Sequence, residues 1–201
     1  MPIFTYDGFS KHIPTWEEHI LGPLSYLKNE RTWILDIGPG EGASTLWFLN
    51  NLADQTYSRV YSLDGWHQKE TEKNFDKNIA ESELSYKVIK VKGNPLQKIN
   101  ELCVTIQTGS TQKFNIIYVN CTTMSLEAMS ILLNAFYILK DDGVMIINNN
   151  EVTHKISTLG GNAVHYREVL GWLRRLLAGR VEIIHSGKQL ILKKINVQNI
   201  S

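Results

Sequence analysis

The chain has 201 residues, 43% of them hydrophobic and 20% charged, and a formal net charge of +1 at pH 7. This length suits one well-buried domain and excludes two full-sized enzyme domains. Because 21 basic residues nearly balance 20 acidic ones, the chain has no overall field to attract nucleic acid or an anionic membrane.

Strand and helix patterns alternate along the chain, which is typical of a parallel sheet with helices on both faces. The expected helices lie at 16–28, 44–52, 69–82, 95–105, 126–139 and 164–177, and the expected strands at 33–37, 60–63, 86–91, 114–119 and 144–147. An Asp142-Gly143 turn should precede the last of these strands. Residues 180–194 then alternate about Ser186-Gly187 and indicate a hairpin. We predict an α/β, Rossmann-like, seven-stranded, mostly parallel sheet with a C-terminal antiparallel hairpin.

The sequence has no evident linker, so we expect one domain over residues 1–195, with an N-terminal helical segment at 1–30 and a polar tail at 196–201. Cys103 and Cys121 lack metal-site spacing, and no apolar run is long enough to span a membrane. The N-terminus lacks the pattern of a signal peptide. We therefore expect a reduced, cytoplasmic protein away from membranes; the sequence leaves its oligomeric state open, a homo-oligomer included.

The strand at 33–37 runs into a glycine-rich turn, Asp36-Ile-Gly-Pro-Gly-Glu-Gly42, followed by a helix. Such a turn lets the backbone approach a nucleotide closely. Gly38, Gly40 and Ala43 also satisfy the dinucleotide pattern, which alone is a weak signal. The acids Asp36 and Glu41 disfavour a pyrophosphate at the helix N-terminus. They favour S-adenosylmethionine, which carries an ammonium and a sulfonium but no phosphate.

A second acid, Asp64, ends the next strand about 20 residues beyond the glycines, the separation at which a carboxylate binds ribose hydroxyls in such folds. Trp66 would then cover the adenine. The alternative is a solvated turn aspartate before Gly65.

Taken together, these motifs resemble the class I S-adenosylmethionine-dependent methyltransferases, in the small single-domain branch called the methyltransferase-24 type. Phe9-Ser10, Ile13-Pro14 and Trp16-Glu17 resemble the entry segment of this family. The other matching segments are Asp36 to Gly42, Asp64-Gly65-Trp66 and the closing strand Gln189 to Lys194.

The resemblance implies that Asp36 and the glycine loop hold the methionine end of the cofactor, that Asp64 holds the ribose and that Asn94 lies beside the adenine. With the start of the following helix and the end of the fourth strand, the candidate cofactor residues are Asp36, Gly38, Pro39, Gly40, Glu41, Gly42, Ser44, Thr45, Asp64, Gly65, Trp66, Asn94 and Asn120.

The chain departs from the family after its fourth and fifth strands, where acids are usual. The matching stretches are Asn120-Cys-Thr-Thr123 and Asn148-Asn-Asn150. Because Mg²⁺ usually requires one or two carboxylates, we predict no catalytic metal.

Two residues are candidates for catalysis. His154 follows the fifth strand and would act as the base, although a surface histidine without a task is the alternative. Asn120 would position the acceptor through its amide. His165, Tyr166 and His67 are weaker candidates. The segment 158–162 is a candidate lid over the acceptor.

Two functions stay open at this point. The first is transfer of a methyl group to oxygen or nitrogen of a small molecule, for which positioning alone supplies much of the barrier reduction. The second is a non-catalytic protein that binds S-adenosylmethionine or S-adenosylhomocysteine, because the acids at 120, 148 and 149 are missing.

Overall fold

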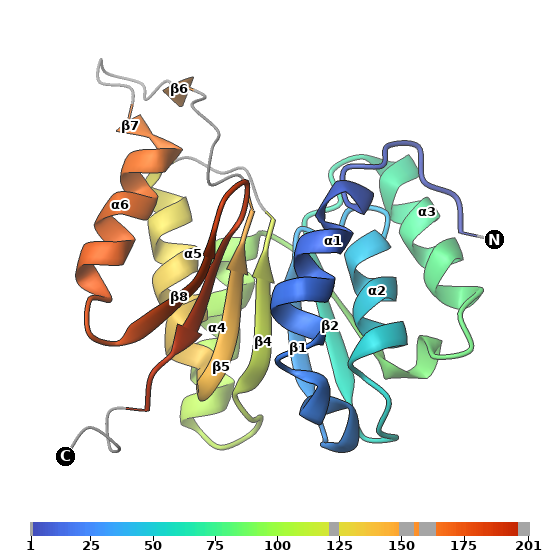
Figure 1. Ribbon diagram of the computed structural model, residues 1–201. Coiled ribbons are helices and arrows are strands. Elements are labelled where there is room, and N and C mark those ends of the chain that lie inside the picture. The colour runs from blue at the N-terminus through green and yellow to red at the C-terminus, as the bar shows by residue number, and fades with distance from the viewer. Residues whose placement is uncertain (1, 121–124, 149–154, 157–163, 197–201) are drawn as a thin grey trace. The chain divides into compact units, whose positions relative to one another are not determined.

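The computed structural model describes residues 2–120, 125–148, 155–156 and 164–196 (Figure 1). The chain divides into two compact units, Met1–Pro95 and Leu96–Ser201. The prediction of one domain over residues 1–195 stays a prediction.

Unit 1 is built on three parallel strands in the order β3-β2-β1. Strand β1 has almost no exposed surface from Ile34 to Ile37, as expected for a strand covered on both faces. Helix α3 has an amphipathic pattern and buries Phe75 and Ile79. The elements are β1 (Trp33–Ile37), α2 (Ala43–Asn51), β2 (Arg59–Asp64), α3 (Lys69–Ala80), η4 (Ser85–Lys87) and β3 (Val88–Lys92).

The N-terminal helical segment is broken into short pieces, where the sequence predicts one helix over 16–28. It begins earlier, because Pro14 suits the first turn of a helix. It is interrupted at Gly22-Pro23, since proline has no N–H to donate and glycine destabilises a helix interior. The pieces are η1 (Ser10–His12), α1 (Ile13–Trp16), the π-helical turn η2 (Glu17–Leu21) and η3 (Ser25–Asn29).

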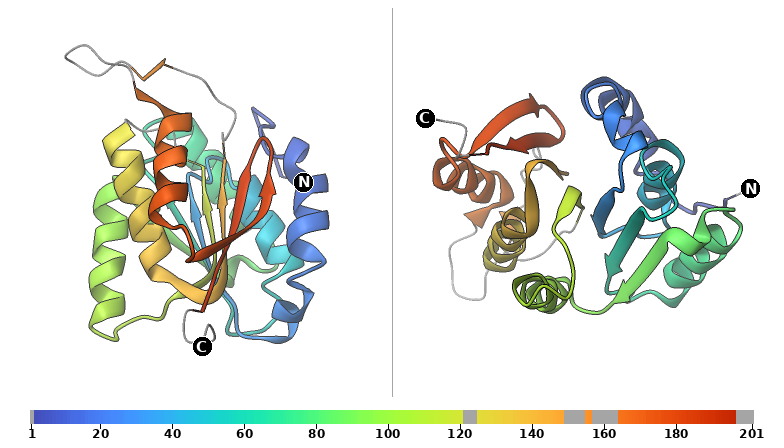
Figure 2. Two further views of the ribbon diagram at one scale, coloured as in Figure 1. Left: turned by 60° about the vertical axis from the view of Figure 1, so that its left-hand side comes forward. Right: turned by 90° about the horizontal axis from the view of Figure 1, so that it is seen from below.

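Unit 2 contains four strands in the order β4-β5-β9-β8. Strands β4 and β5 are parallel, whereas β9 pairs antiparallel with both β5 and β8. Helix α5 packs on β4 and β5 and lies beside α6 (Figure 2). The elements are α4 (Pro95–Gln107), β4 (Phe114–Val119), α5 (Ser125–Ile138), β5 (Leu139–Ile147), β6 (Lys155–Ile156), β7 (Val164–His165), α6 (Tyr166–Leu176), β8 (Val181–Ser186) and β9 (Leu190–Lys194).

The parallel strands of each unit and the closing hairpin confirm the predicted class, an α/β protein with mostly parallel strands and an antiparallel C-terminus. Two boundaries differ. The predicted helix over 164–177 begins only at Tyr166, after β7. Asp142 and Gly143 lie inside β5, where the pairing with β4 shifts register and Asp142 takes a φ of 61°. The predicted turn is thus an irregularity within a longer strand.

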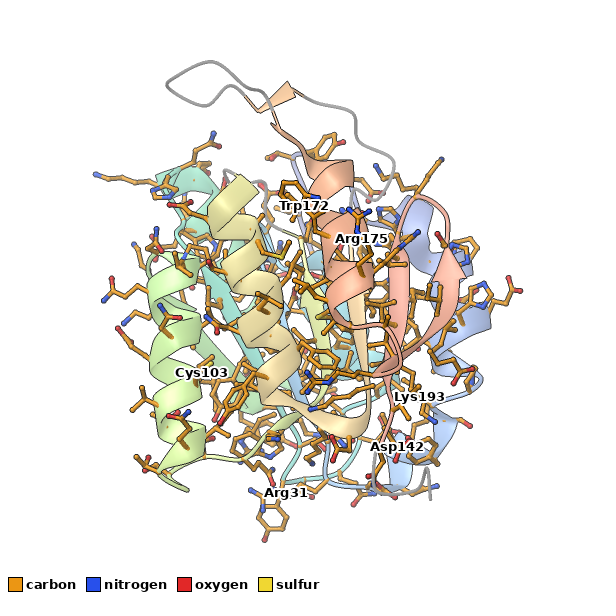
Figure 3. The ribbon with its side chains drawn as sticks, turned by 90° about the vertical axis from the view of Figure 1, so that its left-hand side faces the viewer. Arg31, Cys103, Asp142, Trp172, Arg175 and Lys193 are labelled. Atoms are coloured by element: carbon orange, nitrogen blue, oxygen red, sulfur yellow. The ribbon has the colours of Figure 1, made fainter. Side chains whose placement is uncertain are left out.

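Ion pairs connect the start of β5 to β9. Lys193 Nζ lies 3.4 Å from Asp142 (Figure 3), and Lys194 Nζ lies 3.3 Å from Asp141. These contacts join the irregular part of β5 to the last residues of the hairpin. No helix among the described residues has both the length and the hydropathy needed to cross a membrane.

Candidate functional site

The glycine loop connects β1 to α2 and lies beside the end of β2. Gly38, Gly40 and Gly42 have φ values of 79°, 57° and 94°, a region that favours glycine. The Gly38 N–H donates to the Leu63 carbonyl at 2.8 Å. A side chain at Gly42 would crowd Phe75 at 3.1 Å, whereas the space over Gly40 is open. The loop therefore packs on α3 near Gly42 and is accessible to a ligand at Gly40.

The Asp64 carboxylate lies against this loop. Its Oδ2 accepts the Gly40 N–H at 3.1 Å, and its Oδ1 accepts the Trp66 N–H at 2.8 Å. Asp64 is partly exposed. Because each carboxylate oxygen can accept more than one hydrogen bond, this side chain can still accept from ribose hydroxyls. The structure thus brings the two predicted motifs together.

Asp36 is fully buried beneath the loop. Its Oδ2 accepts hydrogen bonds from the Ser44 and Thr45 hydroxyls, both at 2.7 Å. Its Oδ1 is buried and has no partner among the described residues. Desolvation raises the pKa of Asp36 to about 7, against the effect of these hydroxyls, and the charge of Asp64 raises it further. A hydrogen-bond donor or a cation beside Oδ1 would therefore stabilise the ionised form of this carboxyl.

The hydroxyls of Ser44 and Thr45 are directed at Asp36 and not outward. Ser44 is 4% exposed and Thr45 is fully buried, and Thr45 Oγ1 lies 2.9 Å from Ser62 Oγ. As donors to Asp36, the two side chains orient its carboxyl. A direct bond from either to a cofactor stays a prediction.

Glu41 bonds to the N-terminal segment. Its carboxylate accepts the Thr5 N–H at 2.6 Å, the Thr5 hydroxyl at 2.7 Å and the Asn74 amide at 2.9 Å. Burial acts to raise the pKa of Glu41, but these hydrogen bonds outweigh it and lower the pKa. In this structure the Glu41 carboxylate therefore holds Thr5 against the glycine loop.

Trp66, just after β2, contacts the glycine loop and holds it in place. Its indole N–H donates to the Gly40 carbonyl at 2.9 Å, its ring lies 4.7 Å from that of Phe75, and only 4% of the residue is exposed. The Lys90 ammonium lies 4.9 Å from the ring centroid. The predicted place of this ring beside an adenine stays a prediction.

The remaining candidates in unit 1 lie at the same strand ends. Pro39 is buried, and its carbonyl accepts the Gly42 N–H at 2.9 Å. Gly65 follows Asp64 directly. The Gly93 N–H donates to the Asp64 carbonyl at 3.0 Å, which places the exposed Asn94 next to the end of β2.

In unit 2, three amides meet at the ends of β4 and β5 and the start of β9. Asn148 donates from Nδ2 to Asn120 Oδ1 at 2.7 Å, and Gln189 donates from Nε2 to Asn148 Oδ1 at 3.4 Å. Asn148 is 9% exposed and Gln189 is 1% exposed. Both asparagine carbonyl oxygens accept within this amide chain.

Several candidates cannot be placed. His154 and the lid segment 158–162 lie outside the described residues, as do Cys121 to Thr123 and Asn149 to Asn150. His67 is exposed after Trp66. Within the part of the chain that the structure describes, no group of three or more histidine, cysteine, aspartate or glutamate side chains could hold a metal ion.

Sequence reasoning missed the partners that hold these groups, namely Thr5, Ser62, Asn74 and Gln189. It also missed Asn78, whose Nδ2 donates to the Glu41 carbonyl at 2.9 Å. Asn74 and Asn78 are four residues apart on a helix, and this spacing could have indicated a shared polar face. Gln189 stands immediately before a strand, where nothing in the local pattern distinguishes it.

The chain matches a protein-family model and resembles solved structures in its fold. A family model described as a methyltransferase domain matches residues 35–150, which is more than half of the chain. A search of curated protein sequences finds no match.

Three similar crystal structures are of methyltransferases. An O-methyltransferase from Bacillus cereus in complex with S-adenosylhomocysteine has a TM-score of 0.68 and 18% identity, over 96% of this chain and 84% of that one. A second structure is TomG from Streptomyces achromogenes, an O-methyltransferase of tomaymycin synthesis, in complex with S-adenosylmethionine. It has a TM-score of 0.65 and 16% identity, over 90% of this chain and 80% of that one. The third is the methyltransferase MycE of the mycinamycin pathway, in complex with Mg and S-adenosylhomocysteine. It has a TM-score of 0.65 and 14% identity, over 96% of this chain and 52% of that one. At these identities the likeness shows a shared Rossmann-like fold.

Proposed function

The chain belongs to the methyltransferase domain family, and from this premise we propose that it transfers a methyl group from S-adenosylmethionine to oxygen or nitrogen of a small molecule, without a catalytic metal. The bound cofactor would supply an electrophilic methyl group on a sulfonium that leaves readily. We include in the proposal a cytoplasmic location and an acceptor other than nucleic acid.

One observation carries this proposal: the Asp64 carboxylate lies against the open glycine loop, with Gly40 N at 3.1 Å from Oδ2. Asp64 would hold the ribose hydroxyls, and the Gly38–Gly42 backbone would hold the methionine end. Asp36 lies beneath, and its buried Oδ1, which has no partner among the described residues, suits a cationic ligand. Neither of these two carboxylates would stabilise a bound pyrophosphate, because both groups are acidic.

The amide chain in unit 2 supports the metal-independent form of the proposal. Mg²⁺ prefers several oxygen ligands, usually with carboxylates among them. Here the carbonyl oxygens of Asn120 and Asn148 already accept hydrogen bonds. Asn120 would instead position the methyl acceptor, and His154 would take a proton from that acceptor.

A non-catalytic binding protein is the second candidate. The same neutral residues, Asn120 and Asn148, favour it, because neither can remove a proton. The two candidates differ in turnover but share the cofactor site.

Calorimetric titration with S-adenosylmethionine, S-adenosylhomocysteine and NAD tests the proposal. We expect micromolar binding of the first two, loss of binding in Asp64→Ala and unchanged binding in Asp54→Ala, which removes an exposed carboxylate of the same unit. Binding of NAD alone, or of none of the three, would contradict the cofactor assignment.

An acceptor screen with and without Mg²⁺ then separates the remaining alternatives. Product formation that is unchanged by a chelator supports a metal-independent enzyme. Product formation only with Mg²⁺ contradicts the metal-independent form. Tight cofactor binding without product on any phenol, carboxylate or amine in the screen favours the binding protein.

A further inference from the structure

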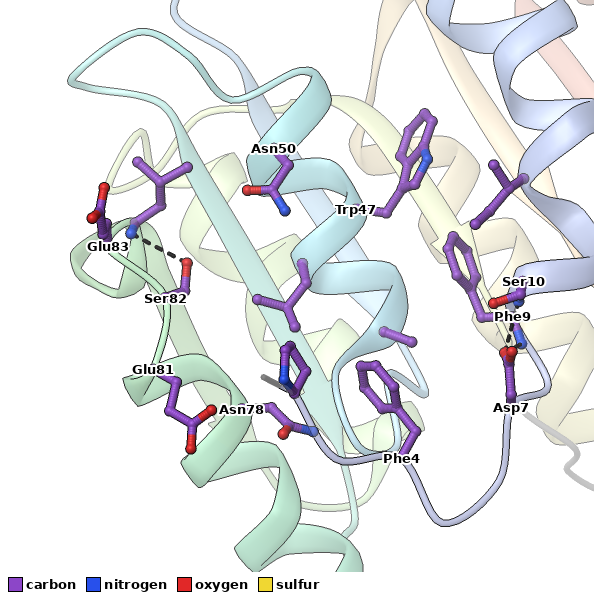
Figure 4. A pocket seen from close by; sticks show the side chains of 15 residues that line it. Phe4, Asp7, Phe9, Ser10, Trp47, Asn50, Asn78, Glu81, Ser82 and Glu83 are labelled. Atoms are coloured by element: carbon purple, nitrogen blue, oxygen red, sulfur yellow. Dashed lines mark hydrogen bonds between the residues drawn. The ribbon is translucent and has the colours of Figure 1, made fainter.

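A cavity of about 900 Å³ lies beside α2 in unit 1 (Figure 4). Its walls come from the outer residues of α2, the chain that follows α3, and residues 2–9, which we call the N-terminal strap. None of the candidate cofactor residues lines it. The cavity is therefore a feature distinct from the glycine loop, although both belong to unit 1.

The larger part of the lining is apolar. Leu46 and Trp47 of α2 are each 8% exposed and make one wall, while Phe4 of the strap is 37% exposed. Phe9 and Leu84 also line the cavity. Ligand sites of small molecules have this character, an apolar lining with a few polar groups and a volume of roughly 300–1,000 Å³.

Hydrogen bonds fix the wall formed by the strap. Asn78 is 1% exposed; it accepts the Ile3 N–H at 2.8 Å and donates to the Ile3 carbonyl at 2.8 Å. The hydrogen bonds from Thr5 to the Glu41 carboxylate hold the following part of the strap. The cavity is thus bounded by an anchored segment, and a ligand would not have to order this wall on binding.

All the charged side chains that the described residues contribute to the lining are acidic. Asp7 lies near the strap end, and Glu81 and Glu83 lie on the chain after α3 (Figure 4). The Ser10 and Phe9 backbone N–H groups donate to Asp7, and bonds from Ser10 hold its pKa below the usual value, so this carboxyl is ionised at neutral pH. Lys77 lies 3.9 Å from Glu81 but is not part of the lining. Among the residues that the structure describes, no lysine, arginine or histidine lines the cavity.

We propose that this cavity binds a small organic cation, an ammonium group attached to an apolar body, at a site separate from the methyl-transfer site. The apolar body would lie on Leu46, Trp47 and Phe4. The ammonium would lie at the rim beside Glu81 and Glu83. An anion of the same shape would be repelled by three carboxylates, so the charge of the ligand and not its apolar area decides selection.

The test uses two probes with one ring system, tryptamine and indole-3-propionate, on the full chain saturated with S-adenosylhomocysteine. Calorimetry gives the affinities, and the indole N–H resonance of Trp47 reports the position of the ligand. We expect tryptamine to bind at micromolar to millimolar concentration and to shift this resonance. Indole-3-propionate should bind far more weakly.

Three variants make the test specific. Glu81→Gln with Glu83→Gln should weaken tryptamine binding roughly three- to tenfold, as expected for two exposed carboxylates. Glu30→Gln with Glu70→Gln removes two exposed acids outside the cavity and should leave the affinity unchanged. Asn50→Phe fills the cavity from α2 and should weaken binding of any occupant.

The proposal is overturned if tryptamine and indole-3-propionate bind equally, if neither binds at millimolar concentration, or if the Glu81 and Glu83 variant binds as the wild type does. It is also overturned if tryptamine binds but leaves the Trp47 resonance unmoved, or if Asn50→Phe binds it as tightly as the wild type. None of these results depends on turnover, so the proposed methyl transfer is tested separately.

Discussion

Asp36 is the residue at which burial and charge are most opposed. It carries a carboxyl with no exposed surface, and only Oδ2 has partners among the described residues. A buried carboxylate without a cation is destabilising, because the charged form loses its hydration. The pKa rise to about 7 is the result of this opposition.

We predict that stability falls with rising pH through the titration of Asp36. Because its pKa rises from 3.8 to about 7 on folding, the folded chain binds more protons than the unfolded chain between these values. The contribution of Asp36 is thus fully present below pH 3.8 and is lost as the pH rises through 7. The difference between these two pKa values corresponds to on the order of 4 kcal/mol, at about 1.4 kcal/mol for each tenfold change in proton affinity.

Urea unfolding of wild type and Asp36→Asn measures this effect. Carboxyls far from position 36 contribute equally in both proteins, so the difference between the two free energies reports Asp36 together with its interaction with Asp64. The variant should gain stability relative to wild type between pH 5 and pH 8. A difference that does not change with pH would contradict the prediction.

Lys87 is a buried cation with a structural role. It is 1% exposed, and its ammonium donates to the carbonyls of Ala53 and Asp54 just after α2, at 2.5 and 2.9 Å. Both carbonyls lie just beyond Asn51, the last residue of α2. The side chain thus connects the end of α2 to the start of β3.

We predict that Lys87→Met lowers the free energy of unfolding by about 1–3 kcal/mol, because it leaves buried carbonyls without donors while keeping most of the apolar stem. Lys98→Met is the control, since its exposed ion pair with Glu101 should contribute roughly 1 kcal/mol or less. Thermal or urea unfolding measures both. Equal stability of the two variants would show that the Ala53 and Asp54 bonds contribute little.

Short-range sequence patterns predicted which residues form the candidate site better than they predicted the hydrogen-bond partners of those residues. Asp36, Gly40 and Asp64 follow a strand–loop–helix pattern whose geometry is nearly fixed by the fold. Glu41 shows the limit. Its position in the loop was evident, but its bonds to Thr5 and Asn74 join segments 36 and 33 residues away, which no local pattern contains.

At the scale of elements, the N-terminal helical pieces are held by aromatic packing. Trp16 is fully buried, and its ring centroid lies 4.8 Å from that of Phe9, 4.9 Å from that of Trp47 and 4.9 Å from that of Phe48. Trp16 belongs to the segment that resembles the entry segment of the family, where an aromatic ring could either cover the cofactor or pack the helical pieces. The contacts with α2 favour packing.

We predict that Trp16→Ala lowers stability by about 3–5 kcal/mol, the usual cost of removing a buried tryptophan. The folded variant should keep its affinity for S-adenosylhomocysteine, and Trp16→Phe should recover part of the stability. Urea unfolding and calorimetry measure the two quantities. A large loss of affinity at retained stability would instead favour a role of the Trp16 ring in covering the cofactor.

The elements best predicted from sequence are the buried strands. The runs 33–37 and 114–119 have the predicted bounds, because an apolar run between turn signals leaves few alternatives. The N-terminal helix and the Asp142-Gly143 turn were wrong in detail. In the first, Gly22-Pro23 interrupts an amphipathic pattern; in the second, pairing along β5 continues through residues that usually form turns.

At the scale of the whole molecule, the chain has two compact units and a predicted single domain. Each unit has its own buried strands and helices. Two independent domains would unfold separately, whereas one domain of this size usually unfolds in a single cooperative step or through intermediates that different probes detect. Unfolding is therefore the measurement that tests the predicted domain organisation.

The distribution of tryptophan makes this test direct. Trp16, Trp33, Trp47 and Trp66 lie in unit 1, and Trp172, which is 42% exposed, lies in unit 2 (Figure 3). In Trp172→Phe, fluorescence reports unit 1 alone, while far-UV circular dichroism reports the helices and strands of both. We predict that the two urea transitions coincide, with one midpoint and one slope, because a single domain over 1–195 exposes its core as a whole. A fluorescence transition displaced from that of circular dichroism would contradict this prediction of a single cooperative transition.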